Sequence, residues 1–300
     1  MANVKKFNLS PSKVKDFMQC PLMYKFKVVD QLSSPPGIDA LRGTHTHAVL
    51  EELFKLKSAD RTVENAYGLI EYVWPIIMKK NATYYSEVPE VSQIENDAEF
   101  REKYHSEIRG CIDNYFKLEN PAKLNMVTAQ EKWVQTDLDD KAKLGGFIDR
   151  VEESDVAGVR ISDYKTGKTP TGQFSTKDLF QMMFYSLIWA KEHKGDIPKQ
   201  VKLLYLKDGG VIADQPNQKK LDEVEANIKE IWAKIQDAQE NNEWTSCQSK
   251  LCDYCNFKPI CPEFGGSGDP KDYALAQVSA EPQAGAAQKR KLTTGEKKEG

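Results

Sequence analysis

The sequence contains no long hydrophobic run and no excess of basic charge. Its 300 residues hold 42 Lys and Arg against 45 Asp and Glu, a formal net charge of -3. No stretch approaches the ~18 apolar residues of a membrane span, and the opening segment MANVKKFNLSPSKVKDF lacks the apolar core of a signal peptide. We therefore expect a cytoplasmic protein with no membrane partner, in which a local patch meets any anionic partner.

Cysteine is scarce and unevenly distributed. The six cysteines lie at positions 20, 111, 247, 252, 255 and 261. Reduced cytosolic thiols are more often metal ligands or catalysts than disulfides. In LCDYCNFKPICP, Cys252, Cys255 and Cys261 have a metal-ligand spacing that needs a fourth thiolate. Either Cys247 completes a local zinc site, or the distant Cys20 completes an iron–sulfur cluster.

The rest of the chain changes from helical to strand periodicity and back. Ser10 and Pro11 predict a helix that ends at Cys20, because Pro21 disfavours helical geometry before it. Further helices are predicted over about 38–56 and within 62–120. Alternation from 131 to 168 predicts three antiparallel strands. A buried helix ending at Gly195, a hairpin and a polar helix over about 219–241 follow.

The segment VRISDYKTGK places an acid and a base on one face of a strand. Residues i and i+2 share a face, so Asp163 and Lys165 enter the same space. Asp149 and Asp163 are symmetric about Val156, and a simple hairpin would set them opposite each other. A hard cation such as Mg²⁺ would neutralise this pair. The alternative is a surface hairpin with solvated ion pairs worth ~0–1 kcal/mol each.

Four other residues are candidates for the same site. His47 lies on an apolar helical stretch, where it is either a metal ligand or a hydrogen-bonded histidine. Gln181 and Tyr185 share one face of a largely buried helix, where they either reach a substrate phosphate or base or form internal hydrogen bonds. Glu131 begins the first strand as either a further carboxylate near the metal or a partner for Arg150.

The order of these motifs resembles the RecB-like branch of the PD-(D/E)XK nuclease superfamily. The matching segments lie between residues 9 and 264: LSPSKVKDFMQCPLMYKF, RGTHTHAVLE, GGFIDRVE, ISDYKTGK, QMMFY and CDYCNFKPICP. The pattern is similar to actinobacterial RecB-family exonucleases, to the AddB nuclease domain and to CRISPR-associated iron–sulfur exonucleases. The Pro-Asp of the superfamily's name is absent, because Ile148 precedes Asp149.

The resemblance implies a site and two cofactors. It implies Mg or Mn held by His47, Asp149, Asp163 and the carbonyl of Tyr164, with Lys165 catalytic. Gln181, Tyr185 and Glu131 would support the DNA or the active site. A 4Fe-4S cluster would be held by Cys20, Cys252, Cys255 and Cys261, with zinc as the alternative metal.

We expect an α/β fold with a restriction-endonuclease-like core, in which helices flank a small mixed sheet. The nuclease domain spans 1–265 with a helical insert at 58–130, and a disordered tail follows at 266–300. The expected activity is metal-dependent exonuclease action on single-stranded DNA ends in recombination or repair, with a helicase or other recombination protein as a possible partner. A non-catalytic module that binds DNA ends or a partner is the alternative.

Overall fold

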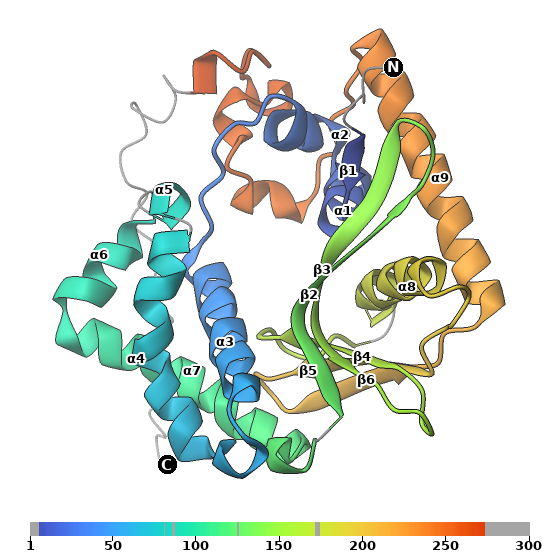
Figure 1. Cartoon of the computed structure of the whole chain (residues 1–300). Helices are drawn as coiled ribbons and strands as arrows, with labels where there is room; N and C mark the ends of the chain where they lie inside the picture. Colours follow the sequence, from blue (N-terminus) through green and yellow to red (C-terminus); the bar gives the residue numbers. More distant parts are fainter. Residues whose placement is uncertain (1–5, 81, 86–87, 125, 172–174, 274–300) are drawn as a thin grey trace, which may run out of the picture. The chain divides into compact units, whose positions relative to one another are not determined.

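A computed structural model describes residues 6–80, 82–85, 88–124, 126–171 and 175–273 (Figure 1). The chain forms two compact units, Met1–Cys247 and Gln248–Gly300. The larger unit contains the sheet and the helices that cover it. Among the described residues, none of the helices combines the length and the apolar content that crossing a membrane requires.

Six strands within the described residues form one mixed sheet. They are β1 (Phe7–Leu9), β2 (Val127–Asp137), β3 (Ala142–Glu152), β4 (Arg160–Lys165), β5 (Gln200–Tyr205) and β6 (Gly210–Asp214). The strands β2, β3 and β4 are antiparallel neighbours, as the alternation predicts, and β5 and β6 form the predicted hairpin. The strands β1 and β3 are parallel, as are β4 and β5, which a helix connects.

Two strands share one edge of β3. The strand β2 pairs along the other edge, over residues 143–152 of β3. On the shared edge, β1 pairs with residues 142–144 and β4 with residues 150–152. In the described part of the chain, residues 145–149 of β3 thus have no strand partner on this edge. The candidate site lies at this gap.

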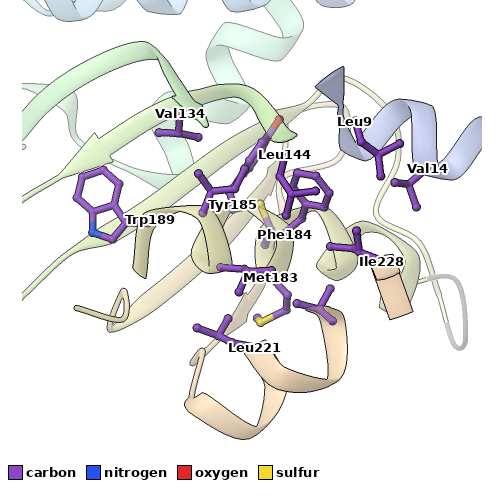
Figure 2. Close-up of a cluster of buried hydrophobic side chains, with 14 of the residues drawn as sticks. Leu9, Val14, Val134, Leu144, Met183, Phe184, Tyr185, Trp189, Leu221 and Ile228 are labelled. Atoms are coloured by element: carbon purple, nitrogen blue, oxygen red, sulfur yellow. The ribbon is translucent and has the colours of Figure 1, made fainter. Parts of the chain in front are cut away.

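Three helices cover one face of the sheet: α1 (Pro11–Gln19), α8 (Ser175–Glu192) and α9 (Gln218–Asn241). Figure 2 shows Met183 and Phe184 of α8 between Leu144 of β3 and Leu221 of α9. Full burial of such a side chain contributes about 1.5–3 kcal/mol. The packing fixes α8 against the sheet, and with it the polar side chains that α8 directs toward the strands.

Side-chain caps account for two helix starts. The Ser10 hydroxyl accepts the Lys13 N–H at 3.3 Å, as the sequence predicts. The helix α1 ends at Gln19, one residue before the predicted Cys20, which is its C-cap with extended backbone. The Asn217 side chain accepts the Lys220 N–H at 3.1 Å and begins α9. The helix α8 ends three residues before the predicted Gly195, because a turn occupies the intervening residues.

A helical lobe covers the opposite face of β4 and β5. It contains α3 (Ile38–Lys55), α4 (Val63–Lys80), α6 (Pro89–Asn96) and α7 (Ala98–Leu118). Alternation along the strands explains how one sheet serves two cores: Ile161 and Leu203 pack toward α8, whereas Tyr164 and Leu204 pack into the lobe. Figure 1 shows α8 and α3 on opposite sides of the β2–β3 ribbon.

Short elements connect these parts. They are α2 (Pro21–Tyr24), the π-helix η1 (Lys25–Val29), η2 (Ser58–Asp60), α5 (Ala82–Tyr85) and η3 (Pro121–Lys123). Helical elements thus occupy the predicted insert from Ser58 to Lys123, and β2 begins at Val127. The boundaries of the insert as a domain stay a prediction.

A buried arginine joins α7 to the sheet. Arg150 of β3 is fully buried, and its guanidinium donates to the hydroxyls of Tyr115 and Tyr164 at 3.0 and 2.9 Å. It also donates to carboxylates of Glu119 and Glu152 at 2.7 and 2.9 Å. Burial favours the neutral form of Arg150, but the tyrosines and glutamates outweigh burial and hold its pKa well above the ordinary value.

The smaller unit is built from short 3₁₀ turns: η5 (Lys250–Tyr254), η6 (Lys258–Ile260) and η7 (Pro262–Phe264). Phe257 and Tyr273 are buried, with ring centroids 5.3 Å apart. Gly268 donates its N–H to the Ile260 carbonyl at 2.8 Å. Within the predicted tail, residues 266–273 therefore form hydrogen bonds and bury Tyr273, and residues 274–300 lie outside the described residues.

Candidate functional site

Three carboxylates lie in one row across β2, β3 and β4. The register of β2 on β3 sets Glu131 opposite Asp149. The register of β3 on β4, continued one residue beyond the pair Arg150–Ser162, sets Asp149 opposite Asp163. This second pair is the one that the symmetry of the hairpin predicts. Three adjacent acidic groups repel one another unless a cation neutralises them.

The first two carboxylates meet a histidine from the helical lobe. His47 of α3 places Nδ1 3.3 Å from Asp149 Oδ2. One ligand atom from each of His47, Glu131 and Asp149 lies within 4.8 Å of the other two. The imidazole thus lies between α3 and the Asp149 carboxylate of the row.

Glu131 has a strained backbone. Its φ is +44°, in the left-handed region that residues with a side chain rarely adopt. Such a conformation costs on the order of 1–3 kcal/mol and persists only where the surrounding structure imposes it. Here it occurs in the middle of a paired strand, at the residue whose carboxylate joins the group around Asp149.

The third carboxylate belongs to a second polar group. Lys165 Nζ lies 2.6 Å from Asp163 Oδ2 and donates to Gln181 Oε1 at 3.0 Å. Gln181 Nε2 in turn donates to Asp163 Oδ1 at 2.8 Å and lies 3.4 Å from the Tyr185 hydroxyl. Lysine and aspartate come from β4, and the amide and phenol come from α8. The core in Figure 2 holds α8 in place, and Tyr185 extends there toward the strands.

The backbone of Tyr164 joins the two groups. Its N–H donates to Asp149 Oδ2 at 2.7 Å, while its neighbours Asp163 and Lys165 belong to the second group. Its hydroxyl accepts a hydrogen bond from Arg150. Tyr164 is therefore held at both ends, and its position fixes the position of Asp149.

A cleft opens beside the first group. It has a volume of about 400 Å³ and is lined by residues of α3 and α4 together with Glu131 and Asp149. Lys80, at the end of α4, and Glu51 of α3 also line it. A ligand in this cleft would thus contact the row of carboxylates directly.

Burial and the charges of neighbouring groups shift the pKa values of the carboxyl groups in the row. Burial and the charge of Asp149 raise the pKa of Glu131 to about 7 and that of Asp163 to about 6. Burial also favours the protonated form of Asp149, but His47 and the Tyr164 N–H outweigh burial and lower its pKa. Burial lowers the pKa of His47, yet the nearby carboxylates, led by Asp149, bring it up to about 9.

Lys165 is favoured in its ammonium form. Burial lowers its pKa, but the contact with Asp163 outweighs burial and leaves the pKa above the ordinary value. A protonated lysine can donate hydrogen bonds to an anionic substrate but cannot accept a proton. In this form Lys165 is a hydrogen-bond donor to anionic groups, as its contact with Asp163 shows.

The donor set of the row fits a hard divalent cation. Carboxylate oxygens are the ligands that Mg²⁺ and Mn²⁺ prefer, and Glu131 and Asp149 present theirs on one side of the cleft. Asp163 is buried, and its Oδ2 lacks a hydrogen bond of good geometry despite the nearby lysine. A cation at the row would offset the repulsion and satisfy that oxygen.

The structure brings the predicted residues together as two adjoining groups. His47, Glu131 and Asp149 form one, and Asp163 and Lys165 contribute to the other. Gln181 and Tyr185 join the second group through the bonds described above. Glu131 lies beside His47 and Asp149, and the guanidinium of Arg150 binds Glu119 and Glu152 instead. The roles of these residues stay predictions.

The four cysteines of the predicted cluster come from both units. Cys20 lies between α1 and α2 in the larger unit, where its Sγ accepts the Met23 N–H at 3.4 Å. Cys252, Cys255 and Cys261 lie among the turns of the smaller unit. Cluster ligation by these cysteines stays a prediction. Cys111 is buried in the helical lobe, where burial raises the pKa of its thiol.

Sequence reasoning missed the aromatic neighbours of the row. Trp133 follows Glu131 by two residues, and Phe147 precedes Asp149 by two, so each shares a strand face with a carboxylate. The period-two alternation of the strands was the sequence signal that could have identified Trp133 and Phe147.

Lys80 had no such sequence signal, because only the packing of α4 beside α3 brings it to the cleft.

Comparison with known proteins gives one family. The model of the PD-(D/E)XK nuclease superfamily matches residues 8–262. The match includes every residue of both polar groups. A search of curated proteins finds no match.

Two solved structures are similar at low identity. The crystal structure described as "Putative exonuclease" from Eubacterium rectale has a TM-score of 0.49 and 12% identity, and the match covers 83% of this chain and 86% of that one. The crystal structure of SSO0001 has a TM-score of 0.34 and 14% identity, with 62% and 81% covered. Because both TM-scores lie below 0.5, these similarities add nothing to the assignment of an activity.

Proposed function

Because the chain belongs to the PD-(D/E)XK nuclease superfamily, we propose that it is a metal-dependent deoxyribonuclease that removes nucleotides from DNA ends. The observation that supports this most directly is the row Glu131, Asp149 and Asp163, with His47 beside Asp149 and Lys165 beside Asp163. Metal cations held by the carboxylates, the Lys165 ammonium and the adjoining cleft together suit an anionic substrate whose transition state gains negative charge.

The row is the proposed site of Mg or Mn. His47, Asp149, Asp163 and the Tyr164 carbonyl are the ligands that the family resemblance implies, and Glu131 is placed to add a further carboxylate. When bound, such an ion polarises a phosphoryl oxygen and lowers the pKa of coordinated water.

The residues beside the row would orient the substrate. Asp163 and Gln181 hold the Lys165 ammonium on the same side of the strand as the carboxylates. From there Lys165 would donate to a phosphate oxygen and stabilise the charge that develops on it. Gln181 and Tyr185, fixed on α8, would keep Lys165 in place and contact the DNA.

Single-stranded ends in recombination or repair are the proposed substrate. The cleft of about 400 Å³ beside the carboxylates is suited to part of one strand rather than to a duplex. The chain's net charge of -3 gives no general attraction to DNA, so the binding must be local. A helicase or other recombination protein would supply such ends.

The test uses anaerobically purified protein and end-labelled single- and double-stranded DNA with Mn²⁺. We expect the parent to release label and Lys165→Ala to release at least about a hundredfold less, in line with loss of one electrostatic contact to the transition state. Lys168→Ala, a lysine in the turn after β4, is the matched control. Equal digestion by the parent and Lys165→Ala would indicate contamination, and intact DNA in both would refute the activity.

A 4Fe-4S cluster is the second proposed cofactor, with a RecB-like, iron–sulfur type of nuclease as the corresponding subtype. The cysteine spacing, together with Cys20, supports it. We expect about four irons per chain in anaerobic protein and their loss in Cys255→Ser, whereas Cys111→Ser retains them. Zinc in place of iron, with Cys247→Ser as the damaging variant, would support the local zinc site instead.

A further inference from the structure

Two exposed aromatic side chains form a pair on the β2–β3 ribbon. Trp133 and Phe147 are cross-strand partners. Their ring centroids lie 4.9 Å apart at 61°, an edge-to-face arrangement. Trp133 is 42% exposed and Phe147 52% exposed, although most large apolar side chains of the sheet are buried.

The aromatic pair lies next to Glu131 and Asp149 on one face of the β2–β3 ribbon. Trp133 and Phe147 each stand two residues from Glu131 and Asp149, respectively, and i and i+2 share a face about 6.6 Å apart. The aromatic pair is therefore close enough to Glu131 and Asp149 for one DNA strand to contact both. The opposite face of the ribbon behaves differently: Val134 packs into the core there, and Lys132 lies over the buried Trp189.

A glycine sets the position of the indole. A Cβ on Gly145 would lie 2.9 Å from Trp133 Cζ2 and 2.6 Å from Asn8 Oδ1. The indole thus lies over bare backbone at Gly145 and packs against the Phe147 ring. An exposed side chain that already packs against its neighbours loses less conformational freedom when a planar ligand stacks on it.

We propose that Trp133 and Phe147 form a stacking platform for the bases of a single DNA strand whose phosphate lies at the carboxylate row. This rests on the proposed nuclease function and specifies how the substrate is held. Stacking on aromatic side chains is tolerant of sequence because every base has a π-face. A duplex offers no unstacked base next to its cleaved phosphate, so the platform favours single-stranded ends.

Binding measurements with defined oligonucleotides test the platform. The probes are a single-stranded oligonucleotide, the same backbone with abasic sites, and a blunt duplex, with Ca²⁺ replacing Mn²⁺ and label recovery verifying intact ends. The variants are Trp133→Ala, Phe147→Ala, the double variant and Trp133→Phe. Val211→Ala is the matched control, since Val211 is 46% exposed on β6, at the far side of the sheet from β2.

We expect each alanine variant to weaken binding of the single strand at least about fivefold and to leave binding of the abasic strand unchanged. Trp133→Phe retains an aromatic face and should bind within about twofold of the parent. It should also lose the quenching of tryptophan fluorescence that the single strand causes in the parent. Thermal unfolding of every variant verifies that the fold is intact.

Two outcomes separate the platform from the nuclease activity. If the parent cleaves single strands while the double variant binds and cleaves them equally well, the platform is refuted and the activity stands. If the parent neither binds nor cleaves DNA, both fall. Equal weakening of the abasic strand would also refute stacking, and a variant that changes only the oligomeric state would assign the pair to contacts between copies of the chain.

Discussion

Asp149 lies at the centre of the carboxylate row. Its carboxylate lies beside His47, accepts the Tyr164 N–H and stands between Glu131 and Asp163 in the row. The sequence alone identified Asp149, because Asp149 and Asp163 are equally distant from Val156 in the predicted turn and a simple hairpin pairs such residues. It could not decide the role of Glu131, since that depends on a left-handed backbone that no local pattern predicts.

Removal of the Glu131 carboxylate should weaken metal binding. In Glu131→Gln the side chain keeps its size but loses its charge beside Asp149, so we expect the Mn²⁺ concentration for half-maximal cleavage to rise about 10- to 100-fold. Glu153→Gln is the control, because Glu153 accepts a hydrogen bond from Thr128 on the same ribbon without lining the cleft. An unchanged Mn²⁺ requirement in Glu131→Gln would remove Glu131 from the metal site.

The buried His45 should make stability depend on pH. Its Nε2 lies 2.8 Å from the Ile70 carbonyl oxygen and its Nδ1 3.3 Å from the Tyr104 hydroxyl. Burial is the main cause that lowers its pKa from 6.5 to about 4, and His105 adds to it. Below pH 6.5, His45 therefore binds a proton in the unfolded chain, whereas in the folded chain it stays neutral down to about pH 4.

The free energy of unfolding should consequently fall as pH drops from 6.5 toward 4, by roughly 3 kcal/mol from this residue. Urea denaturation of the parent and of His45→Gln at several pH values measures the difference, which cancels the carboxylates common to both proteins. Curves that stay parallel from pH 7 to pH 4 would contradict the assignment.

At the scale of elements, the crossing of helices over the sheet determines which polar side chains meet. The strands β2 to β4 and the helices α1, α3 and α9 follow from capping residues and periodicity. The parallel contact of β1 with β3 does not, because it joins segments more than a hundred residues apart with no local signal. The same holds for Arg150, whose partners Tyr115 on α7 and Glu119 directly after it become visible only in three dimensions.

Arg150 should be among the most sensitive positions for stability. Arg150→Ala leaves Glu119 and Glu152 buried with fewer cationic partners, and breaking such a buried network costs about 3–5 kcal/mol. Arg109→Ala, which removes a partly exposed partner of Glu102, should cost no more than ~1 kcal/mol. Denaturant unfolding of both proteins gives the comparison, and similar losses in the two would show that the network contributes little.

At the scale of the whole molecule, repulsion among the three carboxylates of the row opposes folding, and His47 and Lys165 offset only part of it. If the row holds Mn²⁺ as proposed, the ion should bind the folded chain, in which Glu131, Asp149 and Asp163 converge, much better than the unfolded chain. We expect saturating Mn²⁺, about a hundredfold above its dissociation constant, to stabilise the protein by about 2.7 kcal/mol. Thermal unfolding with and without Mn²⁺ measures this, and Asp149→Asn should lose most of the gain. A gain that Asp149→Asn retains in full would place the binding of Mn²⁺ elsewhere.

The shared edge of β3 has a consequence for synthesis of the chain. The strand β1 consists of residues 7–9, but its partners are residues 142–144. At about 5–20 residues per second, a ribosome needs on the order of ten seconds to make the intervening segment. The start of the chain therefore emerges long before the strand that receives it, and during this interval α1 has no sheet to cover its apolar face.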